Sequence, residues 1–195
     1  ISGTKIIGPD GKEFIPVGAN VNGPHAFWDD PTIGKAATAK RWGWNTIRVT
    51  TCMPGGCIIN GSQPYDISVN NDLDTIIAQY TNQKIVTMIN FHHFSAGSIP
   101  SSTQLAQAST WWKDTATRYK DNPYVWFNLI NEPGSLDSTL DQWNSVTDTL
   151  ATAVRSTGAQ NIIVADAAYF GQDSRDWSCS ATFPYTNSGI INRGP

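Results

Sequence analysis

A single carboxylate follows the most apolar stretch of this chain. Residues 125–130, with the sequence VWFNLI, lead directly into Asn131, Glu132 and Pro133. An apolar run of this length is typical of a strand buried on both faces, as in a parallel sheet covered by helices. Because Pro133 cannot donate to a sheet ladder, we expect the strand to end here, with Glu132 at its carboxyl end. In barrels of parallel strands this end carries the active site, where a carboxyl group can transfer protons.

The composition excludes several classes of function. The chain has 195 residues, which fits one domain, and its net charge of −3 with few charged residues gives no basic footprint for nucleic acid. No apolar run is long enough to span a membrane. Eight tryptophans, among many Asn, Ser and Thr residues, suit a surface that binds sugar rings, although tryptophans also fill cores.

Predicted strands and helices alternate along the chain. The expected strands span residues 15–21, 45–50, 84–93, 125–130 and 161–168. The expected helices span residues 30–42, 71–83, 102–120 and 136–156. We expect Trp42 on the apolar face of the first helix, a hairpin over residues 5–14, and a loop or the start of another helix over residues 174–195. Alternation of this kind predicts an α/β fold with a parallel sheet.

Two of these strands carry polar residues that need an explanation. Arg48 interrupts the second strand, and a charged residue inside a strand is rarely buried without a partner. His92 and His93 end the third strand. Because neighbouring strand residues point to opposite faces, these two histidines cannot both bind one metal ion in regular β geometry. We therefore expect no metal site.

These residues together resemble glycoside hydrolase family 5, the family of cellulases and β-mannanases, whose members are retaining (β/α)8 barrels. Asn131-Glu132-Pro133 is similar to the family's acid/base motif, while Arg48 and His92 match its Arg and His at strand ends. Asn90 stands where the family more commonly has Asp. The resemblance implies that Glu132 is the catalytic acid/base and that Asn131, Arg48 and His92 bind substrate or orient the carboxylates. It implies no cofactor.

Two aromatic residues are further candidates for substrate binding. Trp28 lies in the loop after the first predicted strand and is expected to line a sugar cleft. Tyr169 lies in residues 166–173, a run that resembles the Asp-Ala-x-x-x-Gly-Gln-Asp segment of bacterial mannanase-type members. Asp166, which opens that run, is expected to be a structural acceptor near the barrel rim and not a nucleophile.

Half of the implied chemistry is missing from this sequence. Five β/α units are predicted, whereas the barrel needs eight. A retaining glycosidase also needs a second carboxylate about 5–5.5 Å from the first. The chain contains only two glutamates, Glu13 and Glu132, and Glu13 belongs to the N-terminal hairpin, which in the family lies at the opposite end of the barrel. The expected fold is therefore a (β/α)8 TIM-barrel type truncated after about five β/α units, with residues 1–195 forming a partial catalytic domain.

Three explanations of this missing half are open. The chain is the N-terminal part of a longer enzyme, which we favour; it pairs with a second chain that completes the barrel; or it has lost catalysis. The first two predict a retaining endo-β-1,4-glycanase that acts on β-mannan or β-glucan. The third predicts a non-catalytic carbohydrate-binding protein. The 2-hydroxyl configuration that distinguishes mannan from glucan depends partly on missing strands, so both substrates stay open.

The cysteines and the composition bear on localisation. Few lysines and many Ser, Thr and Asn residues favour a secreted protein. Cys52 and Cys57 flank a short turn, so we predict a disulfide between them that leaves Cys179 reduced.

Overall fold

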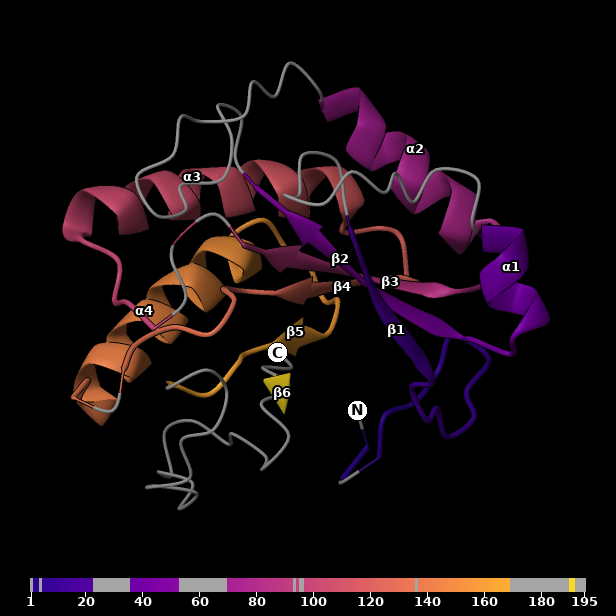
Figure 1. Ribbon diagram of the computed structural model, residues 1–195, viewed down its shortest axis with the longest axis horizontal. Coiled ribbons are helices and arrows are strands. Elements are labelled where there is room, and N and C mark those ends of the chain that lie inside the picture. The colour runs from indigo at the N-terminus through magenta and orange to yellow at the C-terminus, as the bar shows by residue number, and fades with distance from the viewer. Residues whose placement is uncertain are drawn as a thin grey trace. The chain divides into compact units, whose positions relative to one another are not determined.

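The computed structural model describes residues 2–3, 5–22, 36–52, 70–92, 94, 97–135, 137–168 and 190–191. The chain divides into two compact units: unit 1 comprises residues 1–93 and 123–126, and unit 2 comprises residues 94–122 and 127–195. Along the chain (Figure 1) the elements are β1 (Gly18–Asn22), α1 (Ala36–Arg41), β2 (Thr46–Thr51), α2 (Asn70–Thr81), β3 (Val86–Phe91), α3 (Ser102–Tyr119), β4 (Val125–Asn128), α4 (Leu140–Arg155), β5 (Ile163–Val164) and β6 (Ile190–Ile191). The five predicted strands and four predicted helices are all present, most of them with shorter bounds.

Unit 1 is built on parallel strands. β1 pairs with β2 and β2 pairs with β3, with Asn20 opposite Arg48 and Arg48 opposite Met88. The start of β4 continues this order, because the Thr87 N–H donates to the Tyr124 carbonyl oxygen at 2.7 Å. Parallel strands joined through helices are the repeating unit of β/α barrels.

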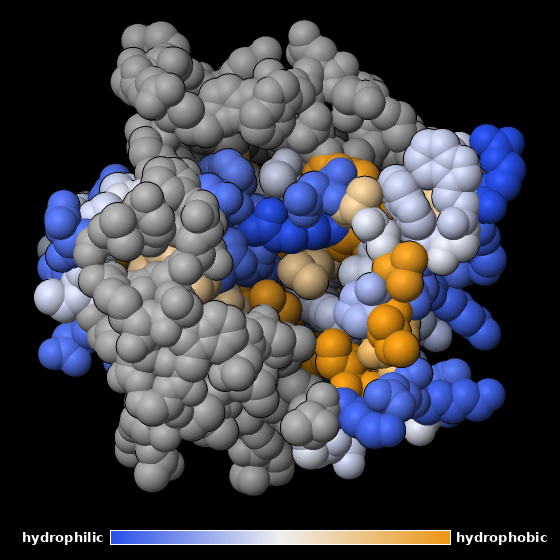
Figure 2. Space-filling model, turned by 60° about the horizontal axis from the view of Figure 1, so that its bottom comes forward, coloured by the Kyte–Doolittle hydropathy of each residue, from blue (hydrophilic) through white to orange (hydrophobic). Residues whose placement is uncertain are grey.

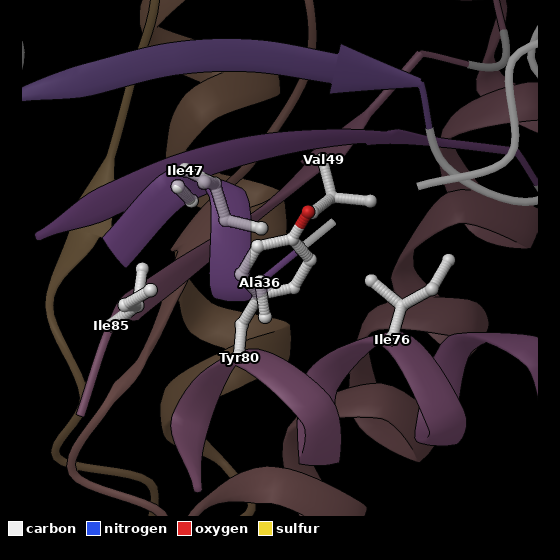
Figure 3. Packing of buried hydrophobic residues seen from close by; sticks show 7 residues of the cluster. Ala36, Ile47, Val49, Ile76, Tyr80 and Ile85 are labelled. Carbon is white, nitrogen blue, oxygen red and sulfur yellow. The ribbon is translucent and has the colours of Figure 1, made fainter. Parts of the chain in front are cut away.

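The core of unit 1 lies on the helix-covered face of its sheet. Ile47 and Val49 of β2 pack against α1 and α2, and the cluster consists of Ala36, Ala39, Ile47, Val49, Ile76, Tyr80 and Ile85. Figure 3 shows the Tyr80 ring rising from α2 among these aliphatic side chains. Burial raises the pKa of the Tyr80 phenol, because the ionised form would lose its hydration there. The apolar residues that repeat along the helices with a period of 3.6 and along the strands with a period of 2 therefore meet in one buried layer.

The N-terminal hairpin is confirmed. Ile7 and Glu13 form an antiparallel bridge, and the Phe14 N–H donates to the Ile6 carbonyl oxygen at 2.8 Å. The Asp10 carboxylate accepts the Lys12 N–H at 3.1 Å, a bond typical of Asp in turns.

Unit 2 contains the second half of β4, residues 127–128, which pairs with β5 in parallel. Helix α3 packs through Trp112, whose ring meets Phe127 edge to face with centroids 5.6 Å apart. The Trp112 Nε1–H also donates to the Leu129 carbonyl oxygen at 2.8 Å, so α3 holds the chain where β4 ends. Both α3 and α4 start with a capping box, Ser101 with Gln104 and Thr139 with Gln142. Such boxes satisfy N–H groups that a helix start leaves without partners.

Three sequence-based expectations about these elements were wrong. Residues 190–191, expected in a loop or helix, form β6, which runs antiparallel to β5. Strand β4 ends at Asn128, before the expected end at residue 130, so Glu132 lies beyond the strand and not at its tip. Trp42 is 62% exposed instead of buried on α1.

Exposed apolar residues occur in unit 1. Ile15 and Val17 are 70% and 51% exposed. Figure 2 draws a face on which hydrophobic residues stand exposed beside strongly hydrophilic ones. Among the described residues, no helix is both long and apolar enough to cross a membrane.

The cysteine prediction is tested at one position. Cys52 is disulfide-bonded. Its predicted partner Cys57 and the predicted free thiol Cys179 both lie outside the described residues. The Cys52 Sγ lies 3.5 Å from the His92 carbonyl oxygen, which is a contact and not a hydrogen bond, because a disulfide sulfur carries no proton.

Candidate active site

Asn131 and Glu132 lie together in unit 2, just beyond β4. Asn131 is buried and Glu132 is half-buried. Glu132 has a φ of +46°, in the left-handed region that residues with a β carbon rarely adopt. Only Lys84 shares this property among the non-glycine residues that the structure describes. Rare backbone conformations of this kind cluster at functional sites, where the surrounding contacts enforce them.

The main chain of Glu132 is held on both sides. Its N–H donates to Oδ2 of Asp166 at 3.2 Å, and its carbonyl oxygen accepts the Gly97 N–H at 2.9 Å. The next turn of chain is held as well, since the Gly134 N–H donates to the Ser98 carbonyl oxygen at 2.9 Å. These contacts leave the Glu132 main chain little freedom to rotate.

Close packing also requires glycine at position 134. Its φ is +76°, and a β carbon there would lie 2.9 Å from Oγ of Ser138 and 3.1 Å from Cδ1 of Ile99. The Ser138 hydroxyl already accepts the Ser135 N–H at 2.8 Å. The turn that follows Glu132 therefore requires glycine, both for its positive φ and for the small space that is available.

Asp166 is the acceptor that organises this end of unit 2. Its Oδ1 accepts the Nδ2–H of Asn128 at 2.9 Å, while its Oδ2 accepts the Glu132 N–H. Its own carbonyl oxygen accepts the Nε1–H of Trp143 at 2.9 Å. The expectation that Asp166 is a structural acceptor is confirmed. Sequence analysis missed Asn128, although an amide inside an otherwise apolar run is a readable signal of a buried polar contact.

Unit 1 carries a polar face opposite its apolar core. Because parallel partners share a face and alternate residues repeat it, Asn20, Arg48, Thr50, Asn90 and His92 lie on one side of the strands. The His92 Nδ1 lies 3.3 Å from Oδ1 of Asn90. Five polar side chains gathered on one sheet face make this face a candidate site, although Val86 and Met88 share it.

A hollow opens on this face. It has a volume of about 290 Å³ and is lined by Pro16, Gly18, Ala19, Asn20, Thr46 and Arg48. The strands approach closely here, since a β carbon on Gly18 would lie 1.6 Å from the Thr46 carbonyl oxygen. Gly18 therefore permits the β1–β2 pairing that forms the wall of the hollow.

The predicted site residues thus fall into two groups. Arg48 and His92 share a face within unit 1, and Asn131 and Glu132 adjoin within unit 2. Trp28 and Tyr169 lie outside the described residues. In the part of the chain that the structure describes, no three His, Cys, Asp or Glu side chains gather into a metal-binding group.

The other glutamate of the chain has a different setting. Glu13 is in the N-terminal hairpin, where its carboxylate forms an ion pair with the Lys5 ammonium at 2.8 Å. Both side chains are about half exposed, at 49% for Glu13 and 58% for Lys5. A solvent-exposed pair of this kind is typical of a surface and not of a catalytic cleft.

Five strands that alternate with four helices and pair in chain order are the architecture of part of a β/α barrel. The family model described as Cellulase (glycosyl hydrolase family 5) matches residues 8–191. The chain belongs to this family.

Individual relatives are distant and longer. The chain is 23% identical over 176 residues to a mannan endo-1,4-beta-mannosidase from Cellvibrio japonicus, covering 89% of this chain and 38% of that protein. It is 24% identical over 182 residues to a mannan endo-1,4-beta-mannosidase from Streptomyces lividans, covering 91% and 43%. The structure of a broad specificity endoglucanase from Clostridium acetobutylicum is similar, with a TM-score of 0.63 at 23% identity, covering 78% and 54%. The chain therefore spans about half or less of the length of these proteins.

Proposed function

We propose that Glu132 is the acid/base of a retaining endo-β-1,4-glycanase. The observation that carries this proposal is the left-handed main chain of Glu132, held from one side by Asp166 and from the other by Gly97. Strained conformations that surrounding contacts enforce cluster at functional sites, which supports a functional role for Glu132. Membership of the family supports the same assignment.

The proposed reaction has two steps. In the first, the Glu132 carboxyl gives its proton to the glycosidic oxygen as the bond to the anomeric carbon breaks and a nucleophilic carboxylate bonds to that carbon. In the second, the Glu132 carboxylate takes a proton from water, whose oxygen attacks the anomeric carbon and releases the nucleophile. The same residue therefore serves as acid and then as base.

The other predicted residues take supporting roles. Asn131, buried next to Glu132, is proposed to hold the 2-hydroxyl of the sugar. Arg48 and His92, which match the family's Arg and His, are proposed to orient the carboxylates. Trp28 and Tyr169 are proposed to contact sugar rings, for which aromatic side chains offer a flat apolar surface.

The nucleophile has no candidate among the glutamates of this sequence. Glu13 is an exposed partner of Lys5. Asp166 is close to Glu132, but both of its carboxylate oxygens accept hydrogen bonds, one of them from Glu132 itself. We propose that the second carboxylate comes from polypeptide beyond residues 1–195, either of the same protein or of a second chain that completes the barrel.

The proposed substrate is a β-1,4-linked mannan or glucan. Relatives named for mannan and relatives named as endoglucanases both match this chain, so the linkage is better supported than the sugar.

The acid/base role is tested with Glu132→Gln in a protein that includes the complete barrel. Activity on mannan or cellulose should fall strongly, because the leaving oxygen needs a proton. Aryl glycosides with acidic phenol leaving groups should still release a burst of phenol, because their departure needs little protonation. Glu13→Gln is the matched control and should leave both activities unchanged. Equal loss on both substrate types, with the fold intact, would contradict the assignment.

A second experiment asks whether residues 1–195 act alone. We expect negligible release of reducing sugar from mannan or carboxymethyl cellulose, and recovery when a separately made chain with the remaining strands is added. Turnover by the lone chain that Asp166→Asn abolishes would make Asp166 the nucleophile. Saturable oligosaccharide binding without turnover in the completed barrel would favour a non-catalytic carbohydrate-binding protein.

Secretion is a further part of the proposal. The disulfide at Cys52 is typical of proteins outside the reducing cytosol. Thiol counting on denatured, unreduced protein should find one free thiol among the three cysteines. Three free thiols would contradict both the disulfide and the compartment.

A further inference from the structure

We propose that Asp166 is a positioning residue that sets the direction of the Glu132 side chain by holding its main chain in the left-handed conformation. This inference rests on the proposed acid/base role of Glu132. Asp166 itself is assigned no contact with substrate.

The geometry joins the two residues through one carboxylate. Oδ2 of Asp166 accepts the Glu132 N–H at 3.2 Å, where φ is +46°. An ionised acceptor makes a stronger bond to an N–H than a neutral one. Because φ and the fixed tetrahedral geometry at Cα determine where Cβ points, the bond that holds this peptide also sets the direction in which the Glu132 side chain leaves the main chain.

Asp166 is fixed by contacts of its own. Its Oδ1 accepts the Nδ2–H of Asn128, which is fully buried in β4. The Asn128 amide also reaches the Val164 carbonyl oxygen at 3.3 Å. From the other side, Trp143 of α4 donates its Nε1–H to the Asp166 carbonyl oxygen. A strand and a helix therefore both hold the residue that holds Glu132.

The hydrogen bond to Asp166 restrains a different peptide from the one that the hydrogen bond to Gly97 restrains. Gly97 donates to the Glu132 carbonyl oxygen and so restrains the peptide that follows Glu132. The peptide that precedes it, with the Glu132 N–H, is restrained by Asp166. Without Asp166 the Asn131–Glu132 peptide can rotate, and φ of Glu132 can return to the common negative range.

We expect the loss of Asp166 to displace the Glu132 carboxyl group from the glycosidic oxygen and to leave substrate binding intact. Removing Asp166 should therefore lower the rate of the step that needs proton donation while the substrate KM stays nearly constant. A misplacement of a catalytic group by about 1 Å lowers rates by about a hundredfold. We expect a fall of about tenfold to a hundredfold in kcat/KM on aryl glycosides with poor leaving groups.

The test compares Asp166→Asn with Asp114→Asn in a protein that includes the complete barrel. Asp114 is an exposed residue of α3, so its variant keeps the same change of charge away from the site. kcat/KM is measured on aryl glycosides across a series of phenol pKa values. In Asp166→Asn the rate should depend more steeply on leaving-group pKa, because the acid assists less, whereas Asp114→Asn should match the parent.

A readout without catalysis accompanies the kinetics. Amide hydrogen exchange of Glu132, followed by NMR in residues 1–195, should be faster in Asp166→Asn by at least about tenfold, because the amide loses its charged acceptor. The Trp112 indole N–H, which is buried in unit 2, reports that the fold persists. If Asp166→Asn does not fold, Trp143→Phe provides a second test, since it removes the bond to the Asp166 carbonyl oxygen and keeps the Asp166 carboxylate.

Each outcome is decisive. Faster Glu132 exchange with a steeper leaving-group dependence supports positioning. Unchanged exchange, or changed exchange with unchanged kinetics, overturns it. Complete loss on all glycosides, recovered by added azide as a substitute nucleophile, would also overturn it and assign nucleophilic attack to Asp166. Failure of the acid/base proposal would appear separately, as full activity of Glu132→Gln on unactivated glycans.

Discussion

The left-handed main chain of Glu132 makes a specific prediction about stability. Replacing Glu132 by Ala or by Gly removes the same carboxylate, and the two variants differ by one β carbon. An L-residue in this conformation is less stable by about 1–2 kcal/mol, whereas glycine adopts it without the steric conflict. Glycine in turn loses more backbone entropy on folding, by roughly 0.5–1 kcal/mol.

Glu132→Gly should therefore be more stable than Glu132→Ala by about 1 kcal/mol. For a chain of this size, that difference raises Tm by about 2–4 °C. The measurement is thermal unfolding by circular dichroism, with urea unfolding at 25 °C to check that the slope with denaturant is the same for both variants. An equal slope shows that the two variants expose the same surface on unfolding.

Lys84 provides the matched control. It is the other described non-glycine residue with positive φ, at +61°, and it is exposed in the turn after α2. Lys84→Gly should likewise exceed Lys84→Ala by about 1 kcal/mol. If glycine is the more stable residue at position 84 but alanine is at position 132, then Glu132 does not hold a left-handed main chain, and its proposed positioning by Asp166 loses its basis.

Three further perturbations test the surrounding fold. Gly18→Ala should destabilise unit 1 by about 2 kcal/mol or more, because the β carbon would meet the Thr46 carbonyl oxygen; a Tm equal to that of the parent would contradict this close approach. Trp112→Phe should lower the unfolding free energy by about 2 kcal/mol through lost packing and an unpaired Leu129 carbonyl group, measured by urea unfolding; a loss below about 0.5 kcal/mol would exclude that hydrogen bond. The raised pKa of Tyr80 means that stability should fall as pH rises above its ordinary value of 10.0, where the unfolded phenol ionises and the folded one does not. In Tyr80→Phe the loss of unfolding free energy that Tyr80 causes between about pH 9 and 11 should be absent. A pH dependence equal to that of the parent would contradict the raised pKa of Tyr80.

The order of elements was predictable because local signals were strong. Helix α3 starts where Ser101 and Gln104 form a capping box and carries buried residues at helical spacing, so its predicted and observed bounds nearly coincide. Strand β6 was not predictable, because two residues, Ile190 and Ile191, contain no period. Their pairing with β5 depends on tertiary contacts that the local sequence does not encode.

The sequence selected candidate residues for the site but not their geometry. The apolar run before Glu132 and the motif around it selected this residue as the candidate carboxylate, and its role stays a prediction. Its left-handed conformation was not predictable, because glutamate has no preference for that region and adopts it only under surrounding contacts. Those contacts come from Gly97 and Asp166, each about 34–35 residues away in sequence, and no local pattern reports them.

The described contacts that hold the Glu132 main chain lie within unit 2, and this bears on what further strands must supply. Gly97 and Asp166, which bond to Glu132, and Asn128, which bonds to Asp166, belong to the same unit as Glu132, so residues 1–195 already supply these contacts to the proposed acid. A retaining glycosidase needs a second carboxylate, and neither Glu13, an exposed surface residue, nor Asp166, which is bonded to the Glu132 amide, is proposed for that role. On the proposed reading, a separately supplied set of strands would meet a Glu132 whose main chain is already held by Asp166 and Gly97. Activity restored by such complementation would therefore report arrival of the proposed nucleophile, and not repair of the proposed acid.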